Sequence, residues 1–188
     1  MEKKTFLYRI LWLPIVGVSK LFNVKIINKE KIVNGNLIIA GNHTSIFDCL
    51  MLIAATKRPV HFLAKKELFT GWKSIIFKNM GLIPVDRSKK DKRVITTSEK
   101  YLNDGSLICI FPEGTTEKGR GLLPFKIGAV KMAKDTNTRI LPFVIKGKYK
   151  LFSKDLYLEF GDYIEVKSND LDKENEKLRQ VIKDMLED

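Results

Sequence analysis

Short apolar runs alternate along the chain with longer segments whose apolar residues recur at helical spacing. The run at 37–40 is branched and lies between two Gly-Asn pairs, which is typical of a buried strand. Residues 156–160 and 163–166 alternate apolar and polar positions, as half-buried strands do. Further strands are predicted at 24–27, 60–64, 81–85, 106–111 and 139–145.

Helices are predicted between these strands. The apolar run at 49–55 is longer than the strands and contains Leu and Ala, and the final segment, 171–186, carries charges between apolar residues at helical spacing. Other helical segments are predicted at 65–77, 88–102 and 126–135, and a polar turn containing Asn34 and Gly35 joins the first two strands. This alternation predicts a single α/β domain with a central, mostly parallel sheet that helices cover on both faces.

The N-terminal segment, residues 1–22, is the most apolar part of the chain and is treated as separate from a domain over 23–188. Arg9, Pro14 and Lys20 interrupt it, whereas a spanning helix needs about 20 apolar residues. No small-x-small cleavage site ends it, as would be typical of a signal peptide. Basic and aromatic residues coincide here, which favours an amphipathic helix lying in the membrane interface. A helix packed on the protein's own core is the alternative.

The length and the net charge of the chain limit the number of domains and the kinds of binding partner. The 188 residues are enough for one domain with a substantial core. A net charge of +12 indicates an anionic partner, such as nucleic acid, an anionic membrane surface or a phosphorylated substrate. Nucleic acid is disfavoured, because the basic residues are spread along the chain without an RNA-binding aromatic motif or a helix-turn-helix signal.

The cysteines and histidines do not suggest a metal. Cys49 and Cys109 each lie inside an apolar run and are predicted to be free core thiols, as in a reducing compartment. His61 alternates with apolar neighbours and is predicted to be a strand residue. Two cysteines and two scattered histidines do not make a zinc site.

The candidate chemistry begins at residues 41–48, between the predicted strand at 37–40 and the helix after it. His43 and Asp48 are five residues apart, so on one continuous helix they would point about 140° apart. They meet if His43 lies in the loop and Asp48 in the first helical turns, with Thr44 or Ser45 as the N-cap. Asp48 then accepts from Nδ1–H and leaves Nε2 free as a base. Taken alone, the pair favours the simpler interpretation, a capping His beside a surface Asp.

Two further charged corners follow apolar strands. Asp86 and Arg87 follow the predicted strand at 81–85, and the planar guanidinium of Arg87 can hold a phosphate there in two-point contact. The strand at 106–111 leads into Pro112, Glu113 and Gly114, a carboxylate loop whose glycine allows close backbone approach. Ligands of such sheets gather beyond the strand ends, so the three corners predict one shared site. Lys118, Arg120 and Lys126 surround the third corner with positive charge.

Four sequence blocks in this order resemble the glycerolipid acyltransferase family, whose members include 1-acyl-glycerol-3-phosphate acyltransferases. The blocks are NHTSIFD at 42–48, GLIPVDR at 81–87, FPEGTT at 111–116 and ILPF at 140–143. The resemblance covers residues from about 25 to 161. It implies transfer of a fatty acyl group from an acyl thioester to the free hydroxyl of a lysophosphatidate, giving phosphatidic acid for phospholipid biosynthesis.

The resemblance also implies roles for single residues. His43 is the general base, held by Asp48, and takes the proton of the glycerol hydroxyl. Arg87 and the loop of Glu113, Gly114 and Thr115 bind the phosphate and glycerol of the acceptor. Because a carboxylate repels a phosphate, Glu113 is expected to bond glycerol hydroxyls or to orient a basic side chain. Lys126 also matches a family position and is expected to neutralise the phosphate. Pro142 is expected either to shape the wall of the site or to serve only as a strand-end proline.

The implied donor is acyl-CoA or acyl-carrier protein, with no cofactor and no metal. The implied location is the cytoplasmic face of the membrane, as a peripheral or monotopic protein. Thr116 stands where many family members carry Arg, with Arg120 or Lys118 as substitutes, and Leu141 is a mild variant of the fourth block. Two alternatives remain, namely the same chemistry on glycerol-3-phosphate or another lysolipid, and a non-catalytic basic lipid-binding module.

Overall fold

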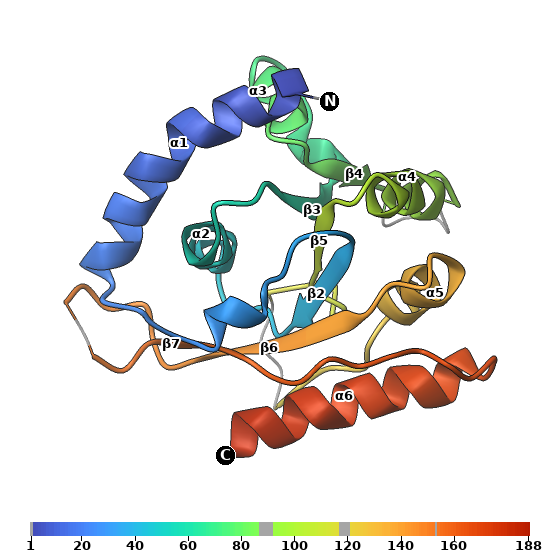
Figure 1. Cartoon of the computed structure of the whole chain (residues 1–188). Helices are drawn as coiled ribbons and strands as arrows, with labels where there is room; N and C mark the ends of the chain where they lie inside the picture. The colour runs from blue at the N-terminus through green and yellow to red at the C-terminus, as the bar shows by residue number, and fades with distance from the viewer. Residues whose placement is uncertain (1, 87–91, 117–120, 153) are drawn as a thin grey trace.

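A central sheet organises the chain in the computed structural model, which describes residues 2–86, 92–116, 121–152 and 154–188 (Figure 1). Within these residues the sheet has seven strands in the order β1-β7-β6-β2-β5-β3-β4. From β6 to β4 all neighbours are parallel, whereas β7 runs antiparallel to β6. The prediction of a mostly parallel sheet is therefore confirmed. The strands are β1 (Lys25–Ile27), β2 (Leu37–Gly41), β3 (Val60–Lys65), β4 (Ile83–Val85), β5 (Leu107–Ile110), β6 (Ile140–Lys146) and β7 (Tyr157–Phe160).

Helices cover both faces of the sheet, as predicted. In Figure 1, α1 and α2 lie on one side of the sheet, with α3 beside the start of α1, and α4, α5 and α6 lie on the other side. Two short 3-10 turns, η1 (Lys29–Lys31) and η2 (Lys66–Leu68), complete the described elements. The α-helices are α1 (Glu2–Leu21), α2 (Phe47–Ala55), α3 (Lys73–Asn79), α4 (Lys92–Asn103), α5 (Gly128–Asp135) and α6 (Leu171–Glu187).

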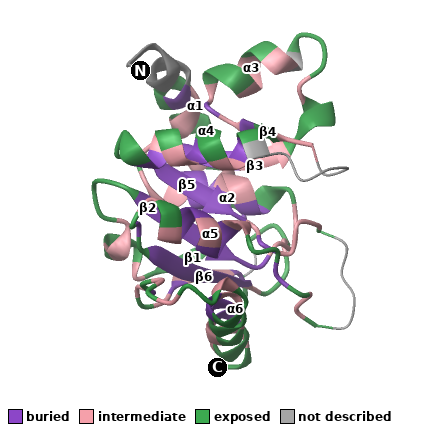
Figure 2. Ribbon diagram, turned by 90° about the vertical axis from the view of Figure 1, so that its right-hand side faces the viewer, coloured by how far each residue is buried: buried purple, intermediate pink, exposed green. Residues whose placement is uncertain are grey.

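The central strand β2 shows why its sequence is apolar throughout. All five residues of β2 are buried, as the purple strands of Figure 2 illustrate for the middle of the sheet. Leu37 and Ile39 belong to the core under α1 and α2, whereas Ile38 and Ala40 belong to the core under α4, α5 and α6. A parallel strand that is covered on both faces needs apolar residues at every position.

Several local predictions differ from the structure. β1 pairs with β7 and not with β2, so the turn at Asn34 and Gly35 joins strands that are not neighbours. Residues 163–166 form only an isolated bridge, between Ile164 and Ile140. The helical segment at 65–77 divides at Gly71, whose φ of 57° is a left-handed value that an α-helix cannot contain.

Helix α1 packs one face on the core of the protein and leaves apolar residues exposed on the other face. It therefore has features of both interpretations of the N-terminal segment, the core helix and the interface helix. Tyr8 and Phe22 are buried in the core, and Trp12 donates from Nε1 to the carbonyl oxygen of Thr56 at 3.0 Å. These three of the aromatic residues that favoured a membrane helix thus pack inward. Ile10 and Leu13 are 52% and 69% exposed on the outer face. Among the helices of the described residues, none has the length and apolarity needed to cross a bilayer.

Gly41 ends β2 at the corner that leads to His43. A Cβ at this position would lie 2.3 Å from the carbonyl oxygen of Phe143 and 2.6 Å from its ring. Because the oxygen belongs to the backbone of the neighbouring strand β6, it cannot move aside without disturbing the sheet. The close approach of β2 and β6 therefore requires glycine here.

We predict that Gly41→Ala lowers the free energy of unfolding by about 2 kcal/mol or more, because the added methyl group forces the two central strands apart. Gly17→Ala in α1 is the matched control. An added Cβ there meets no atom within 4 Å, so we expect a change of less than about 1 kcal/mol, in the stabilising direction. Urea denaturation followed by circular dichroism measures both, and equal midpoints for Gly41→Ala and the wild type would contradict this packing argument.

Candidate active site

The first corner brings His43 and Asp48 together as predicted. Nδ1 of His43 lies 2.8 Å from Oδ2 of Asp48. His43 lies in the loop after β2, and Asp48 is the second residue of α2, so the two side chains meet across the loop-to-helix turn. The side chain of Asp48 is fully buried, and that of His43 is 15% exposed. One edge of the imidazole is thus fixed inside the protein while part of the ring stays within reach of solvent.

Asp48 collects hydrogen bonds from the whole turn. Its Oδ2 accepts from the backbone N–H of Thr44 at 2.5 Å and of Ser45 at 2.9 Å, and its Oδ1 accepts from Oγ1 of Thr44 at 3.1 Å. The helix begins at Phe47 with Ile46 in the N-cap position, so the prediction of Thr44 or Ser45 as the N-cap is wrong. The carboxylate of Asp48, in the first turn of α2, instead accepts the amide protons of two residues that precede the helix.

These bonds decide the charge of Asp48. Burial alone would favour the neutral acid. The hydrogen bonds from His43, from the hydroxyl of Tyr149 and from the backbone of Ser45 and Thr44 outweigh that effect, and they hold the pKa of Asp48 below its ordinary value. An ionised carboxylate beside Nδ1 selects the tautomer that carries its proton on Nδ1. Nε2 then keeps its lone pair.

An aromatic ring fixes the plane of the imidazole. Phe111 stacks on His43 with ring centroids 3.9 Å apart and an angle of 13° between the planes. Phe111 follows β5 directly and contacts Phe62 at 6.5 Å and Phe143 at 5.9 Å between centroids. His43 is therefore held by a carboxylate at its edge and by a packed ring on its face.

The third corner is joined to the first through Glu113. One carboxylate oxygen of Glu113 accepts from the backbone N–H of His43 at 3.1 Å, and the other accepts from the backbone N–H of Leu123 at 3.0 Å. The carboxylate thus ties together the loops that follow β2 and β5. A bond to a glycerol hydroxyl, or to a basic side chain, stays a prediction that these contacts do not address.

Gly114 and Lys126 also lie together. Gly114 has a φ of 70°, and a Cβ at its position would be 2.9 Å from Nζ of Lys126. The exposed side chain of Lys126 therefore lies across the glycine, with its backbone N–H bonded to the carbonyl oxygen of Pro112 at 2.9 Å. Thr115 follows in the same loop. Arg87, Lys118 and Arg120 lie outside the described residues.

Pro142 lies inside the sheet. It is buried in β6 opposite Ala40 of β2, and its ring lies close to Gly161, on the side where Met185 of α6 also lies. The N–H of Gly161 donates to the carbonyl oxygen of Pro142, and Lys31 donates to the carbonyl oxygen of Gly161 at 3.0 Å. Pro142 has no backbone N–H that could donate to the carbonyl oxygen of Gly161, and the ammonium of Lys31 donates to that oxygen instead. This position gives Pro142 a structural role, and its predicted role as a site wall stays a prediction.

Sequence reasoning missed Tyr149. This residue follows β6, and its hydroxyl donates to Oδ1 of Asp48. Burial and the charge of Asp48 raise the pKa of Tyr149 above its ordinary value, so the hydroxyl keeps the proton that it donates. Its ring contacts Phe22 at 5.5 Å and Phe47 at 5.6 Å between centroids. The sequence offers one signal for it. Tyr149 is a polar aromatic residue just beyond an apolar strand, and this strand ends at the same edge of the sheet as the strands before the other corners.

Comparison with known proteins identifies relatives of the chain. The family model described as Acyltransferase matches residues 23–146. The chain is 34% identical to the 1-acyl-sn-glycerol-3-phosphate acyltransferase of Borreliella burgdorferi over 165 residues, which are 80% of this chain and 64% of that protein. It is 32% identical to the enzyme of the same name from Bacillus subtilis over 127 residues, 66% of this chain and 63% of that protein. The chain thus spans less than two thirds of the length of either relative.

A solved structure shares the fold. The crystal structure of the 1-acyl-sn-glycerophosphate (LPA) acyltransferase PlsC from Thermotoga maritima superposes with a TM-score of 0.76, covering 96% of this chain and 80% of that one. At 20% identity this likeness shows the fold alone. Within the described residues, no group of three or more His, Cys, Asp or Glu side chains is arranged to hold a metal ion.

We predict that Tyr149→Phe destabilises the protein in a pH-dependent way. The pKa of Asp48 is lowered in the folded state, so its bonds stabilise the fold above the ordinary Asp pKa of about 3.9, and this contribution is lost as the pH falls through the folded pKa. Without the hydroxyl, we expect the free energy of unfolding to fall by about 1–2 kcal/mol at neutral pH. The difference in the free energy of unfolding between the variant and the wild type should become smaller as the pH falls, because the wild type then loses the same contribution.

Urea denaturation across a pH series measures this effect. Tyr157→Phe is the matched control, because the hydroxyl of Tyr157 accepts from the exposed ammonium of Lys25 at 3.2 Å and, among the residues that the structure describes, bonds to no buried carboxylate. A Tyr149→Phe deficit that stays constant with pH would show that the hydroxyl does not stabilise the charge of Asp48.

Proposed function

The chain belongs to the acyltransferase family, and from this premise we propose that it transfers a fatty acyl group from an acyl thioester to 1-acyl-glycerol-3-phosphate. The acceptor is the free glycerol hydroxyl, and the product is phosphatidic acid. The names of the relatives favour this substrate. The observation that carries the proposal is the partly exposed His43, whose Nδ1 is bonded to the fully buried carboxylate of Asp48.

In this mechanism His43 is the general base. Nε2 takes the proton of the glycerol hydroxyl as that oxygen attacks the thioester carbon. The new C–O bond forms, the C–S bond breaks, and the leaving thiolate takes the proton from the imidazolium. Asp48 stabilises the transient positive charge of the ring and holds its orientation. No covalent acyl-enzyme is needed, because the thioester is already activated.

The backbone of the corner limits where the oxyanion is stabilised. The amides of Thr44 and Ser45 donate to Asp48, and the amide of His43 donates to Glu113. Because these three donors already serve carboxylates, we infer that the developing negative charge on the thioester oxygen is met by other groups. In this mechanism the carboxylates of Asp48 and Glu113 hold the backbone of the loop after β2 in place and do not accept the proton of the glycerol hydroxyl.

The phosphate of the acceptor is assigned to the third corner. Lys126 is an exposed residue whose side chain lies across Gly114, and Thr115 follows in the same loop. We propose that Lys126 neutralises the phosphate, together with Arg87, which lies beyond the described residues. The net charge of +12 suits an acceptor, a donor and a membrane that are all anionic. The proposed donor is acyl-CoA or acyl-carrier protein, and no cofactor is required.

The test is acyl transfer to 1-acyl-glycerol-3-phosphate in mixed micelles, with acyl-CoA and acyl-carrier protein offered as separate donors. We predict that the wild type forms phosphatidic acid with at least one donor. His43→Ala should lower kcat/KM by about a thousandfold, since general base catalysis is worth that much. The assay measures product by mass spectrometry.

The second histidine provides the control. His61 is buried and its Nδ1 is bonded to the carbonyl oxygen of Gly81 at 2.8 Å, so His61→Asn keeps a donor near that place and should retain activity. Retained activity in a folded His43→Ala protein would contradict the mechanism. A wild type that acylates glycerol-3-phosphate or another lysolipid, but not 1-acyl-glycerol-3-phosphate, would change the proposed acceptor and leave His43 as the proposed base.

We further propose that the protein works at the cytoplasmic face of the membrane, bound as a peripheral or monotopic protein through the N-terminal segment. The exposed outer face of α1, which contains Ile10 and Leu13 beside Arg9 and Lys20, supports this proposal. An apolar helical stripe flanked by basic residues binds anionic interfaces.

We predict that replacing Ile10 and Leu13 together by Ser lowers binding to anionic vesicles by about tenfold, because two aliphatic side chains no longer enter the interface. Deleting the segment is the poorer test, since Tyr8 and Phe22 belong to the core. Vesicle sedimentation measures binding, and Lys29→Ser and Val33→Ser form a control pair outside the helix. Unchanged sedimentation of the helix variant would rule out contact through this face.

A further inference from the structure

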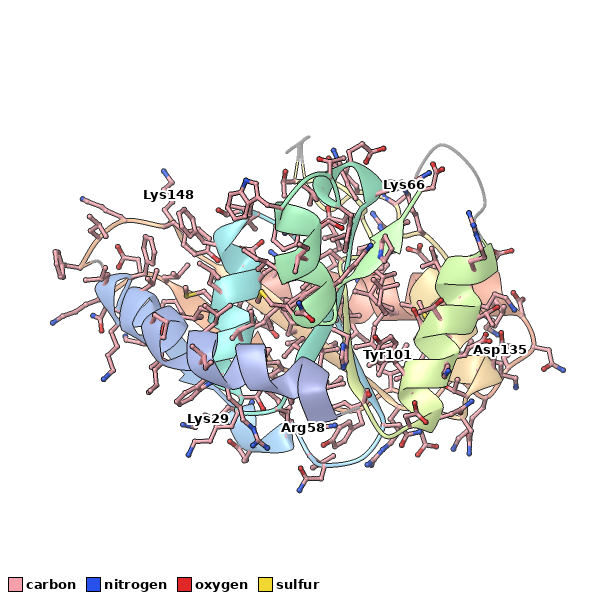
Figure 3. All side chains as sticks on the ribbon, turned by 90° about the horizontal axis from the view of Figure 1, so that it is seen from above. Lys29, Arg58, Lys66, Tyr101, Asp135 and Lys148 are labelled. Carbon is pink, nitrogen blue, oxygen red and sulfur yellow. The ribbon has the colours of Figure 1, made fainter. Side chains whose placement is uncertain are left out.

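The connection between β6 and β7 is a closed loop. At its start Gly147 has a φ of 95°, and a Cβ there would lie 1.8 Å from the carbonyl oxygen of Asp155 at its end. The two ends of the loop therefore touch. In Figure 3, Lys148 lies on the same edge of the molecule as Lys66, which follows β3, and opposite Lys29 and Arg58.

The loop turns one aromatic residue inward and one outward. Tyr149 donates to the buried Asp48 and contacts Phe22 and Phe47. Phe152 is 74% exposed, and its neighbour Leu151 is 57% exposed. The inward residue fixes the base of the loop on the candidate active site, while its apolar tip faces outward.

The tip is held in place by the end of α1. The backbone N–H of Phe152 donates to the carbonyl oxygen of Leu21 at 2.8 Å. Phe152 has a φ of 57°, a left-handed value that is strained for a residue with a side chain. The strained backbone of Phe152 carries a ring that is 74% exposed. Leu21 is itself exposed, so the loop and the helix end form one apolar surface, which we call the tip patch: Leu21, Leu151 and Phe152.

Positive charge surrounds the tip patch. Lys148, Lys150 and Lys154 are exposed in the loop, and Lys20 is exposed at the end of α1. Within a Debye length of about 8 Å at physiological salt, such lysines attract an anionic surface. The combination of exposed apolar side chains with flanking lysines is typical of segments that enter the headgroup region of anionic bilayers.

We propose that the tip patch inserts into the surface of an anionic membrane, as a second contact besides the outer face of α1. The proposal rests on the proposed function for its purpose, because a lysophosphatidate acceptor resides in the bilayer. Exposed Leu and Phe side chains flanked by lysines suit the interface of an anionic bilayer, which adapts to the shape of what enters it. A partner protein would instead have to offer a matching groove.

The position of the tip patch connects membrane contact to the reacting groups. Tyr149 lies three residues before Phe152, and its hydroxyl contacts the carboxylate that holds His43. Ile46, which is 77% exposed, lies between His43 and Asp48 in sequence and precedes Phe47. Insertion of the tip patch thus brings the edge that holds His43 close to the headgroups, where the free hydroxyl of the acceptor lies.

The test places a polarity-sensitive fluorophore on Phe152→Cys and, as the matched control, on Lys29→Cys at the opposite edge. The native thiols interfere little, because Cys109 is buried and burial raises the pKa of Cys49 to about 12. Phosphatidylcholine vesicles with and without phosphatidylglycerol are added, and collisional quenching by lipids brominated near the headgroup reports depth. On anionic vesicles we expect the label at position 152 to shift to the blue and to be quenched, and the label at position 29 to do neither.

Each other outcome overturns the proposal. A label at position 152 that stays as exposed to water as the control, whether the protein sediments with the vesicles or not, excludes insertion. A label that responds only to an acidic acyl-carrier protein identifies a protein-docking face instead. Because neither readout requires acyl transfer, a failure of the proposed function would be seen separately.

A second measurement links the tip patch to activity. Leu151→Ser/Phe152→Ser should lower transfer to acceptor embedded in anionic vesicles by about tenfold, since two apolar side chains leave the interface. Transfer to a short-chain acceptor dissolved as monomers should be unchanged, because neither residue contacts the reacting groups. Equal losses with both acceptors would show that the variant damages the site and would contradict a role in membrane contact.

Discussion

The geometry of the candidate site depends on one buried negative charge, the carboxylate of Asp48. A charge without solvent contact is stable only when donors surround it. Here the donors are Nδ1 of His43, the backbone of Thr44 and Ser45, and the hydroxyl of Tyr149. The same bonds that stabilise the charge also set the tautomer of the imidazole and the shape of the turn, so electrostatics, local fold and proposed chemistry share one cause.

The rest of the molecule supports that corner from a distance. Glu113 joins the backbone of His43 to the loop at 121–127, and α6 holds that loop from the far side. Asn175 donates to the carbonyl oxygen of Phe125 at 2.8 Å, and Arg179 donates to that of Leu122 at 3.3 Å. A helix that contains none of the predicted site residues therefore helps to place the backbone of the proposed base.

Much of this could be predicted from the sequence, because parallel strands that are buried on both faces leave continuous apolar runs, and their carboxyl ends share one edge. That reasoning located His43, Asp48 and Glu113. It could not identify Tyr149 or the bridging role of Glu113, because bonds between loops depend on strand order, which periodicity does not encode. It also expected the aromatic residues of α1 to face a membrane, since composition alone does not tell which face of a helix packs inward.

The most direct test of the central claim is the protonation pattern of His43 in the folded protein. Nitrogen-15 NMR of the neutral imidazole distinguishes a proton on Nδ1 from one on Nε2. The account predicts a protonated Nδ1 and an Nε2 with its lone pair free, and it predicts that Asp48→Asn disturbs this pattern while the fold persists. A neutral ring that carries its proton on Nε2 would contradict the account, because such a ring has no lone pair to offer the acceptor hydroxyl.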